Sequence, residues 1–198
     1  MTKTATNTPR LQRQDAQRNR ERILEAATRA FTVSGLDTSL EAVAHAAGVG
    51  IGTLYRHFPS REALVLTAYR HEVDQLCARA DEVLLALPPD QALRVWTGDL
   101  AAYVVTKRGM APVLKAILQP GDPYFSEVRT HIYAALERLL VAASQAGSIR
   151  ADFDVSDVMQ AMNGIWLTTS QPEQHPQTER LLNLLMDGLR YGNSSNDR

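Results

Sequence analysis

The chain contains a single cysteine, Cys77, among its 198 residues. One cysteine excludes both an intramolecular disulfide framework and a zinc site built on paired cysteines. The histidines are isolated from one another, and none shows the His-x-x-x-His spacing of a helical metal site. The sequence therefore predicts no metal and no other cofactor.

Long apolar runs are also missing. No run approaches the roughly 20 residues that a helix needs to span a bilayer. The N-terminal stretch MTKTATNTPRLQRQDAQRNRER lacks the apolar core that a signal peptide carries. We therefore expect a cytoplasmic protein without a membrane partner.

Motifs of catalysis are absent as well. Gly48, Gly50 and Gly52 lie between two expected helices, so they indicate a turn and not a phosphate-binding loop after a strand. Serine, histidine and aspartate residues are scattered without a nucleophile elbow. We therefore expect a protein that is not an enzyme.

The formal net charge of −1 conceals an asymmetry along the chain. Residues 1–64 carry nine Lys and Arg against six Asp and Glu, whereas residues 65–198 carry twelve against sixteen. A basic first part joined to an acidic remainder indicates that only the first part meets a polyanion such as DNA. The alternative is a solvated basic tail.

Apolar residues make up 44% of the chain and recur at helical spacing, without a run that alternates with a period of two. This pattern predicts an all-α protein of about nine helices, the first three forming a head on a helical bundle. We expect a flexible arm over 1–17, the head over 18–64, and a ligand-binding and dimerisation domain over 65–198. The predicted helices cover about 18–35, 38–48 (with Thr38 and Glu41 as a capping box), 53–58, 60–87, 93–109, 113–118, 122–147, 155–166 and 181–189.

The stretch GVGIGTLYRHFPSREAL, residues 48–64, carries the most informative pattern. On a helix, Leu54 and Phe58 fall on one side, whereas Thr53, Arg56 and His57 point away from them. Tyr55 lies between the two faces. Hydroxyl, phenol, guanidinium and imidazole groups suit phosphate oxygens and base edges, and two short helices joined by a glycine turn form a helix-turn-helix.

The segment RILEAATRAFTVSGLDTSLEAVAHAAGVGIGTLYRHFPSREAL, residues 22–64, resembles the TetR family of bacterial transcription regulators. The resemblance implies a DNA-binding regulator in which Arg56 reads bases. It departs from the family pattern at Gly50, where a capping Ser is common, and at Arg61, where Lys is commoner. The candidate DNA-binding residues are Thr38, Ser39, Gly50, Ile51, Gly52, Thr53, Tyr55, Arg56, His57 and Arg61, with Arg18 and Arg20 from the arm.

The resemblance further implies a homodimer on a near-palindromic operator and a repressor that a small ligand releases. The expected dimer contacts, from the last two helices, are Val158, Met162, Ile165, Trp166, Leu181, Leu184, Leu185 and Leu189. Large side chains of the second domain either line an apolar ligand cavity or fill the core; they are Trp96, Tyr103, Met110, Phe125, Tyr133, Met159, Met162 and Trp166. The alternative function is an all-helical enzyme or binding protein with a vestigial head.

Overall fold

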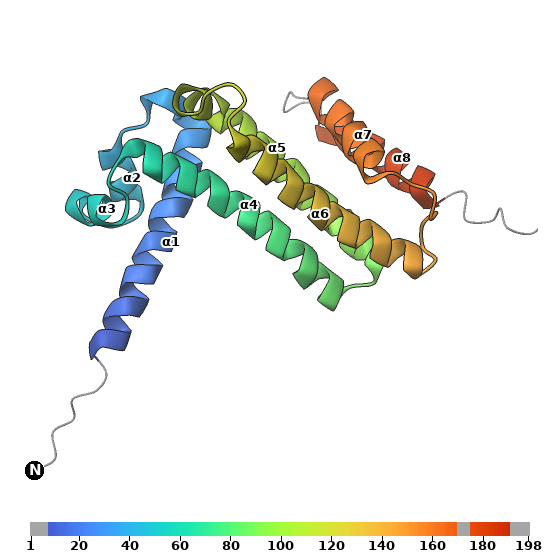
Figure 1. Ribbon diagram of the computed structural model, residues 1–198, viewed down its shortest axis with the longest axis horizontal. Coiled ribbons are helices and arrows are strands. Elements are labelled where there is room, and N and C mark those ends of the chain that lie inside the picture. The colour runs from blue at the N-terminus through green and yellow to red at the C-terminus, as the bar shows by residue number, and fades with distance from the viewer. Residues whose placement is uncertain (1–7, 170–174, 191–198) are drawn as a thin grey trace, which may run out of the picture. The chain divides into compact units, whose positions relative to one another are not determined.

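The computed structural model describes residues 8–169 and 175–190. Within these ranges the chain forms eight α-helices and one short 3₁₀-helix, without a strand, which confirms the all-α prediction (Figure 1). No helix in the described ranges is both long and apolar enough to cross a membrane. The elements are α1 (Thr8–Ser34), η1 (Gly35–Asp37), α2 (Leu40–Ala46), α3 (Ile51–His57), α4 (Arg61–Ala86), α5 (Pro89–Ile117), α6 (Pro123–Gln145), α7 (Val155–Thr168) and α8 (His175–Arg190).

The chain divides into two compact units. The first comprises residues 1–72 and 105–120, and the second comprises residues 73–104 and 121–198. The chain passes from one unit to the other inside α4 and inside α5. The second half of α5 therefore folds with the helix-turn-helix, although it lies far from it in the sequence.

Helix α1 begins at Thr8, about ten residues before the expected start at Arg18. The predicted flexible arm covered residues 1–17, of which 1–7 lie outside the described residues. The rest of the predicted arm, residues 8–17, is helical although it has no apolar stripe. At the end of this segment the Gln17 side-chain amide donates to the Glu21 carboxylate at 2.8 Å. Polar contacts at a spacing of four residues support a helix without apolar periodicity.

The first unit is held by an apolar cluster between α1 and α3, in which Phe31, Leu54 and Phe58 are buried. Helices α2 and α3 both pack on α1 (Figure 1). Burying each such side chain contributes about 1.5–3 kcal/mol. The seven residues of α3 are too few to form a stable helix alone, so this packing holds α3 in place.

Helix α5 corrects the prediction of two separate helices over 93–109 and 113–118. Gly109 and Pro112 both lie inside one continuous helix. Gly147 follows the end of α6 with a φ of +69°, in the left-handed region that ends helices. Gly109 does not have a positive φ, so the helix continues through it. A Cβ on Gly109 would lie 2.3 Å from the Thr32 carbonyl oxygen, and glycine therefore permits close backbone packing of α5 on α1. One uninterrupted helix in place of two reduces the count from nine to eight.

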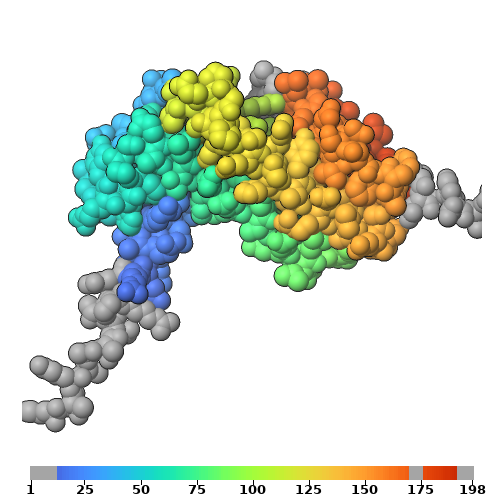
Figure 2. Space-filling view, viewed as in Figure 1, coloured from blue at the N-terminus to red at the C-terminus, as the bar shows by residue number. Residues whose placement is uncertain are grey.

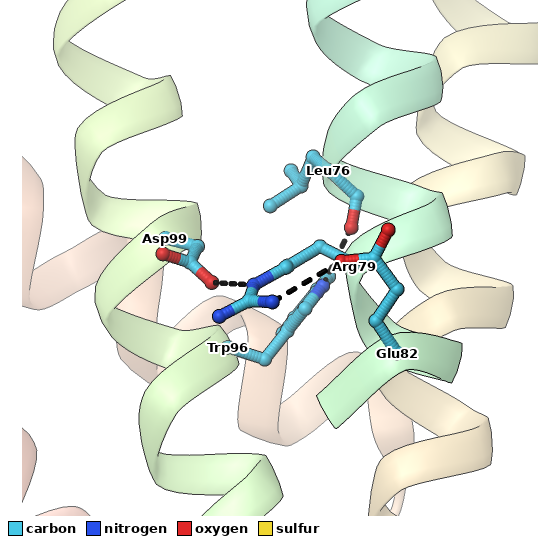
Figure 3. Close-up of polar contacts among 5 residues, drawn as sticks. All are labelled: Leu76, Arg79, Glu82, Trp96 and Asp99. Atoms are coloured by element: carbon cyan, nitrogen blue, oxygen red, sulfur yellow. Dashed lines mark hydrogen bonds and ion pairs between the residues drawn. The ribbon is translucent and has the colours of Figure 1, made fainter. Parts of the chain in front are cut away.

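The second unit is built from the last part of α4, the first part of α5, and helices α6–α8. The buried Trp96 indole N–H donates to the Leu76 carbonyl at 2.8 Å, and the Arg79 guanidinium contacts Asp99 at 3.4 Å and Glu82 at 3.1 Å (Figure 3). The bonds of Trp96 to Leu76 and of Arg79 to Asp99 join α4 to α5, whereas the Arg79–Glu82 pair lies within α4. Helix α7 packs on both α6 and α8, and Figure 2 shows the gold surface of α6 directly against the orange surface of α7.

Candidate nucleic-acid interface

Helix α3 presents a polar face to solvent. Leu54 and Phe58 are buried, whereas Tyr55 is 47% exposed and Arg56 is also exposed. Thr53, His57 and the preceding Ile51 and Gly52 complete this surface, being half-buried or exposed. Because α3 contains no acidic residue, no carboxylate within the helix neutralises Arg56. The structure thus brings the predicted α3 residues together on one surface.

The turn before α3 depends on glycine at one position. Gly48 adopts φ +64°, which favours glycine over residues with a Cβ. The guanidinium of Arg22 lies against this turn. A Cβ on Gly48 would lie only 2.3 Å from Arg22 Nη2, so glycine also leaves the space that this guanidinium occupies. Gly50 caps α3 through its carbonyl, which accepts from the Thr53 amide at 2.9 Å, and it offers no side-chain cap.

Two adjacent hydroxyl groups before α2 have different partners. Ser39 Oγ accepts from the Ala42 amide at 3.1 Å and is exposed, so its own proton remains available for a phosphate oxygen. Thr38 is only 5% exposed, and its hydroxyl donates to the Ala30 carbonyl at 3.0 Å. Ser39 is therefore the observed cap of α2, and the expected capping box of Thr38 and Glu41 is wrong.

The arginines at the edge of this surface lie on regular helices. Arg18 is exposed on α1, and the Arg20 guanidinium carbon lies 5.1 Å from the centre of the Phe58 ring. Arg61 is half-buried at the start of α4, where its guanidinium donates to backbone carbonyls before α2. Arg20 and Arg22 thus add positive charge to the α3 side of the head, whereas Arg61 is engaged internally.

The predicted dimer residues divide into two sets. A groove of about 680 Å³ between α7 and α8 is lined by six of the eight, Val158, Ile165, Leu181, Leu184, Leu185 and Leu189. In this set Leu184 is 68% exposed. The other two, Met162 and Trp166, are buried and do not line this groove. Sequence reasoning missed the neighbouring polar edge, where Arg150 pairs with Asp152 at 2.6 Å.

The predicted ligand residues are mostly buried. Met110 belongs to the first unit, whereas the other seven belong to the second. Phe125 is exposed, and Tyr133 is half-buried and lines a groove of about 320 Å³ beside Arg129 and Glu137. The remaining six, all buried, are Trp96, Tyr103, Met110, Met159, Met162 and Trp166. Among the described residues, no three His, Cys, Asp or Glu side chains gather as metal ligands.

Two family models match the chain. Residues 23–68 match the model described as "Bacterial regulatory proteins, tetR family", and residues 88–191 match "Transcriptional regulator SbtR-like, C-terminal domain". The second match alone spans more than half of the chain. The chain belongs to the TetR family. The resemblance that the helix-turn-helix segment suggested is therefore confirmed, and it extends to the helical domain that follows.

Solved structures agree with this membership. The TetR transcriptional regulator SCO0520 from Streptomyces coelicolor is 48% identical, with a TM-score of 0.82, covering 86% of this chain and 98% of that one. A TetR regulatory protein from Mycobacterium vanbaalenii is 32% identical, with a TM-score of 0.75, covering 90% of this chain and 98% of that one.

A curated relative matches by sequence over a shorter stretch. The HTH-type transcriptional repressor KstR of Mycolicibacterium smegmatis is 38% identical over 89 residues, 43% of this chain and 44% of the repressor. The match thus spans less than half the length of that curated relative.

Proposed function

We propose that this TetR-family protein is a transcription repressor that binds a near-palindromic operator as a homodimer and is released by a small ligand. The observation that carries the DNA-binding part is the exposed surface of α3. Tyr55 and Arg56 face solvent there, while Leu54 and Phe58 anchor the helix from the opposite side. A surface helix with cationic and hydrogen-bonding groups suits the major groove of DNA.

Each residue of this surface has a role set by its chemistry. Arg56 reads a base, with guanine as the preferred partner of its forked donors, and Ile51 contacts a thymine methyl. Tyr55, His57, Thr53 and Ser39 donate to phosphates. Arg18 and Arg20 add attraction to the backbone from α1, while Gly50 and Gly52 allow close approach.

Selection from random duplexes, followed by gel-shift titration, tests the DNA-binding part directly. We expect a two-fold symmetric site whose half-sites lie about one helical turn apart, because each protomer inserts one α3. The affinity should fall steeply with salt. Recovery of no preferred sequence, together with weak binding at low salt, would instead support the alternative of a vestigial head.

The groove between α7 and α8 supports the dimeric assembly, with a second copy of the chain as the partner. Its apolar lining includes Ile165, Leu181 and Leu185, together with Leu184, which is 68% exposed. Exposed apolar side chains in one patch are typical of protein interfaces. Two helices from each protomer would then form a four-helix bundle.

Sedimentation of a charge variant tests this interface. Replacing both Ile165 and Leu185 with Glu should give a folded monomer, because pairing would bury unpaired carboxylates. The matched control is Leu85→Glu on α4, since Leu85 is 91% exposed and lies outside the groove. A double variant that still sediments as a dimer would place the interface elsewhere.

The effector we propose is small and apolar or aromatic, and it binds among the large side chains of the second unit. Both tryptophans of the chain, Trp96 and Trp166, belong to that unit. Selectively excited tryptophan fluorescence therefore reports on the second unit, where the proposed ligand site lies, and not on the head. A compound that releases the protein from DNA should change this emission, whereas release with unchanged emission would contradict the proposed location.

A further inference from the structure

Arg61 occupies a position at which the resemblance implied contact with DNA, but the structure gives its guanidinium internal partners. One terminal nitrogen donates to the carbonyl of Thr38. The other donates to the carbonyl of Leu36 at 2.8 Å and lies 3.5 Å from that of Gly35. Both terminal nitrogens are thus directed at the junction between α1 and α2, defined here as residues 35–39.

The flat face of the same guanidinium is also covered. Its central carbon lies 5.0 Å from the centre of the Phe31 ring, and Phe31 is fully buried in the first unit. A cation over an aromatic ring gains further stabilisation when water is partly excluded. The terminal nitrogens of Arg61 point at backbone carbonyls, and one face of its guanidinium lies on the Phe31 ring. Arg61 therefore has no free pair of terminal N–H groups for a phosphate.

The place of Arg61 in the chain gives these contacts a consequence. Arg61 is the first residue of α4, and only residues 58–60 separate it from the end of α3. Ser60 caps α4 by accepting from the Ala63 amide at 3.1 Å. A clamp at the first residue of α4 therefore fixes where α3 ends relative to α1 and α2.

Thr38 belongs to the same arrangement. Its carbonyl accepts from Arg61, and its hydroxyl donates to Ala30 of α1. The junction is thus tied on one side to α1 and on the other to α4. Carbonyls at the end of a helical turn carry partial negative charge, which favours a cation there.

We propose that Arg61 is a positioning residue, which holds α3 in its reading orientation by clamping the junction of residues 35–39, and that it does not bind a DNA phosphate. The proposal rests on the proposed DNA-binding function. The clamp requires a planar fork, which lysine lacks because its ammonium is a single point charge on a flexible stem. Arg61→Lys should therefore fail to replace arginine even though it keeps the charge.

The test compares Arg61→Lys and Arg61→Gln with Arg29→Gln, which removes an exposed arginine of α1 outside the proposed DNA surface. Hydrogen exchange of the Thr38 amide measures whether the junction opens. We expect it to accelerate at least about tenfold in both Arg61 variants, because charge-assisted hydrogen bonds are lost. The amide of Leu24, a buried residue of α1 in the same unit, should exchange as in the wild type, which shows that the first unit of each variant is folded.

The second readout is the slope of log affinity against log salt on a mixed-sequence DNA duplex. We expect the same slope for Arg61→Lys, Arg61→Gln and Arg29→Gln. A phosphate contact would instead make the slope of Arg61→Gln shallower by about 0.9 while Arg61→Lys kept the wild-type slope. That difference, or wild-type exchange at Thr38 in Arg61→Lys, would overturn the proposal. If the wild-type protein bound no duplex at all, the proposed function would fail, and exchange at Thr38 would still test the clamp.

Discussion

Gly52 in α3 is a glycine that the fold of the protein does not require. Its φ is not positive, and a Cβ built on it would meet no other atom within 4 Å. Glycine inside a helix costs about 0.5–1 kcal/mol relative to alanine. Gly52→Ala should therefore raise the free energy of unfolding by about this amount, since the added methyl group enters open space in the free protein.

DNA binding should respond in the opposite direction. If the backbone at Gly52 approaches a sugar or base edge closely, a methyl group there must displace its neighbour. Overpacking of this kind costs about 1–3 kcal/mol, which corresponds to roughly 5- to 150-fold in affinity. Denaturant unfolding and fluorescence anisotropy with the selected duplex measure the two effects separately.

The matched control is Gly98→Ala in α5. Gly98 also lies inside a helix with open space around its Cβ position, and it belongs to the second unit. This variant should gain similar stability and keep its DNA affinity. Wild-type affinity in Gly52→Ala would refute the close approach, and a less stable Gly52→Ala protein would refute the reasoning about its open surroundings.

Further outcomes at Gly109, Trp96 and Cys77 follow from contacts inside the protein. Gly109→Ala should lower the free energy of unfolding by about 1–3 kcal/mol in urea titrations, because its Cβ meets the Thr32 backbone; unchanged stability would contradict the tight packing of α5 on α1. Trp96→Phe should cost about 1 kcal/mol or more in the same assay, since it loses the bond to Leu76 and leaves a small void; a neutral result would contradict that contact. Burial raises the pKa of the Cys77 thiol, so folded protein should react with iodoacetamide more slowly than urea-unfolded protein at mildly alkaline pH. Because the folded state holds this proton more tightly, the free energy of unfolding should also fall as pH rises from the ordinary thiol pKa toward the raised pKa of the folded state, and a Cys77→Ser variant should lack that component.

Much of the fold was predictable because it depends on local signals. The start of α4 near residue 60, where Ser60 caps the helix, and the end of α6 near Gly147 both depend on residues near one another in the sequence. The buried anchors of α3, Leu54 and Phe58, follow from helical spacing. Periodicity and caps thus defined most elements without tertiary information.

The failures share a physical cause, which is contact between residues distant in the sequence. In the sequence, Gly109 indicates the end of a helix. In the structure it lies inside α5 because the Thr32 backbone packs against it, and the sequence near Gly109 gives no sign of that contact. Thr38 and Ser39 are equally suited to cap α2, and the choice depends on the Ala30 carbonyl, which takes the Thr38 proton. The internal partners of Arg61 lie more than twenty residues earlier, so no local pattern predicts them.

The early start of α1 has a different cause. Sequence patterns identify an amphipathic helix by its apolar face, and residues 8–17 have almost none. A polar segment continued from a packed helix avoids the cost of nucleation. It therefore extends α1 toward the N-terminus without a signal of its own.

The most direct test of the central claim is the affinity of Arg56→Ala for the selected operator and for a scrambled duplex, measured by anisotropy at one salt concentration. Arg29→Ala, which removes another exposed arginine of the first unit, is the control. The account predicts that Arg56→Ala loses about 1–3 kcal/mol on the operator and much less on scrambled DNA, because a base-reading contact carries sequence information. Equal losses on both duplexes would contradict base reading by Arg56 and make it a phosphate contact, whereas no loss on either would contradict the placement of α3 against DNA.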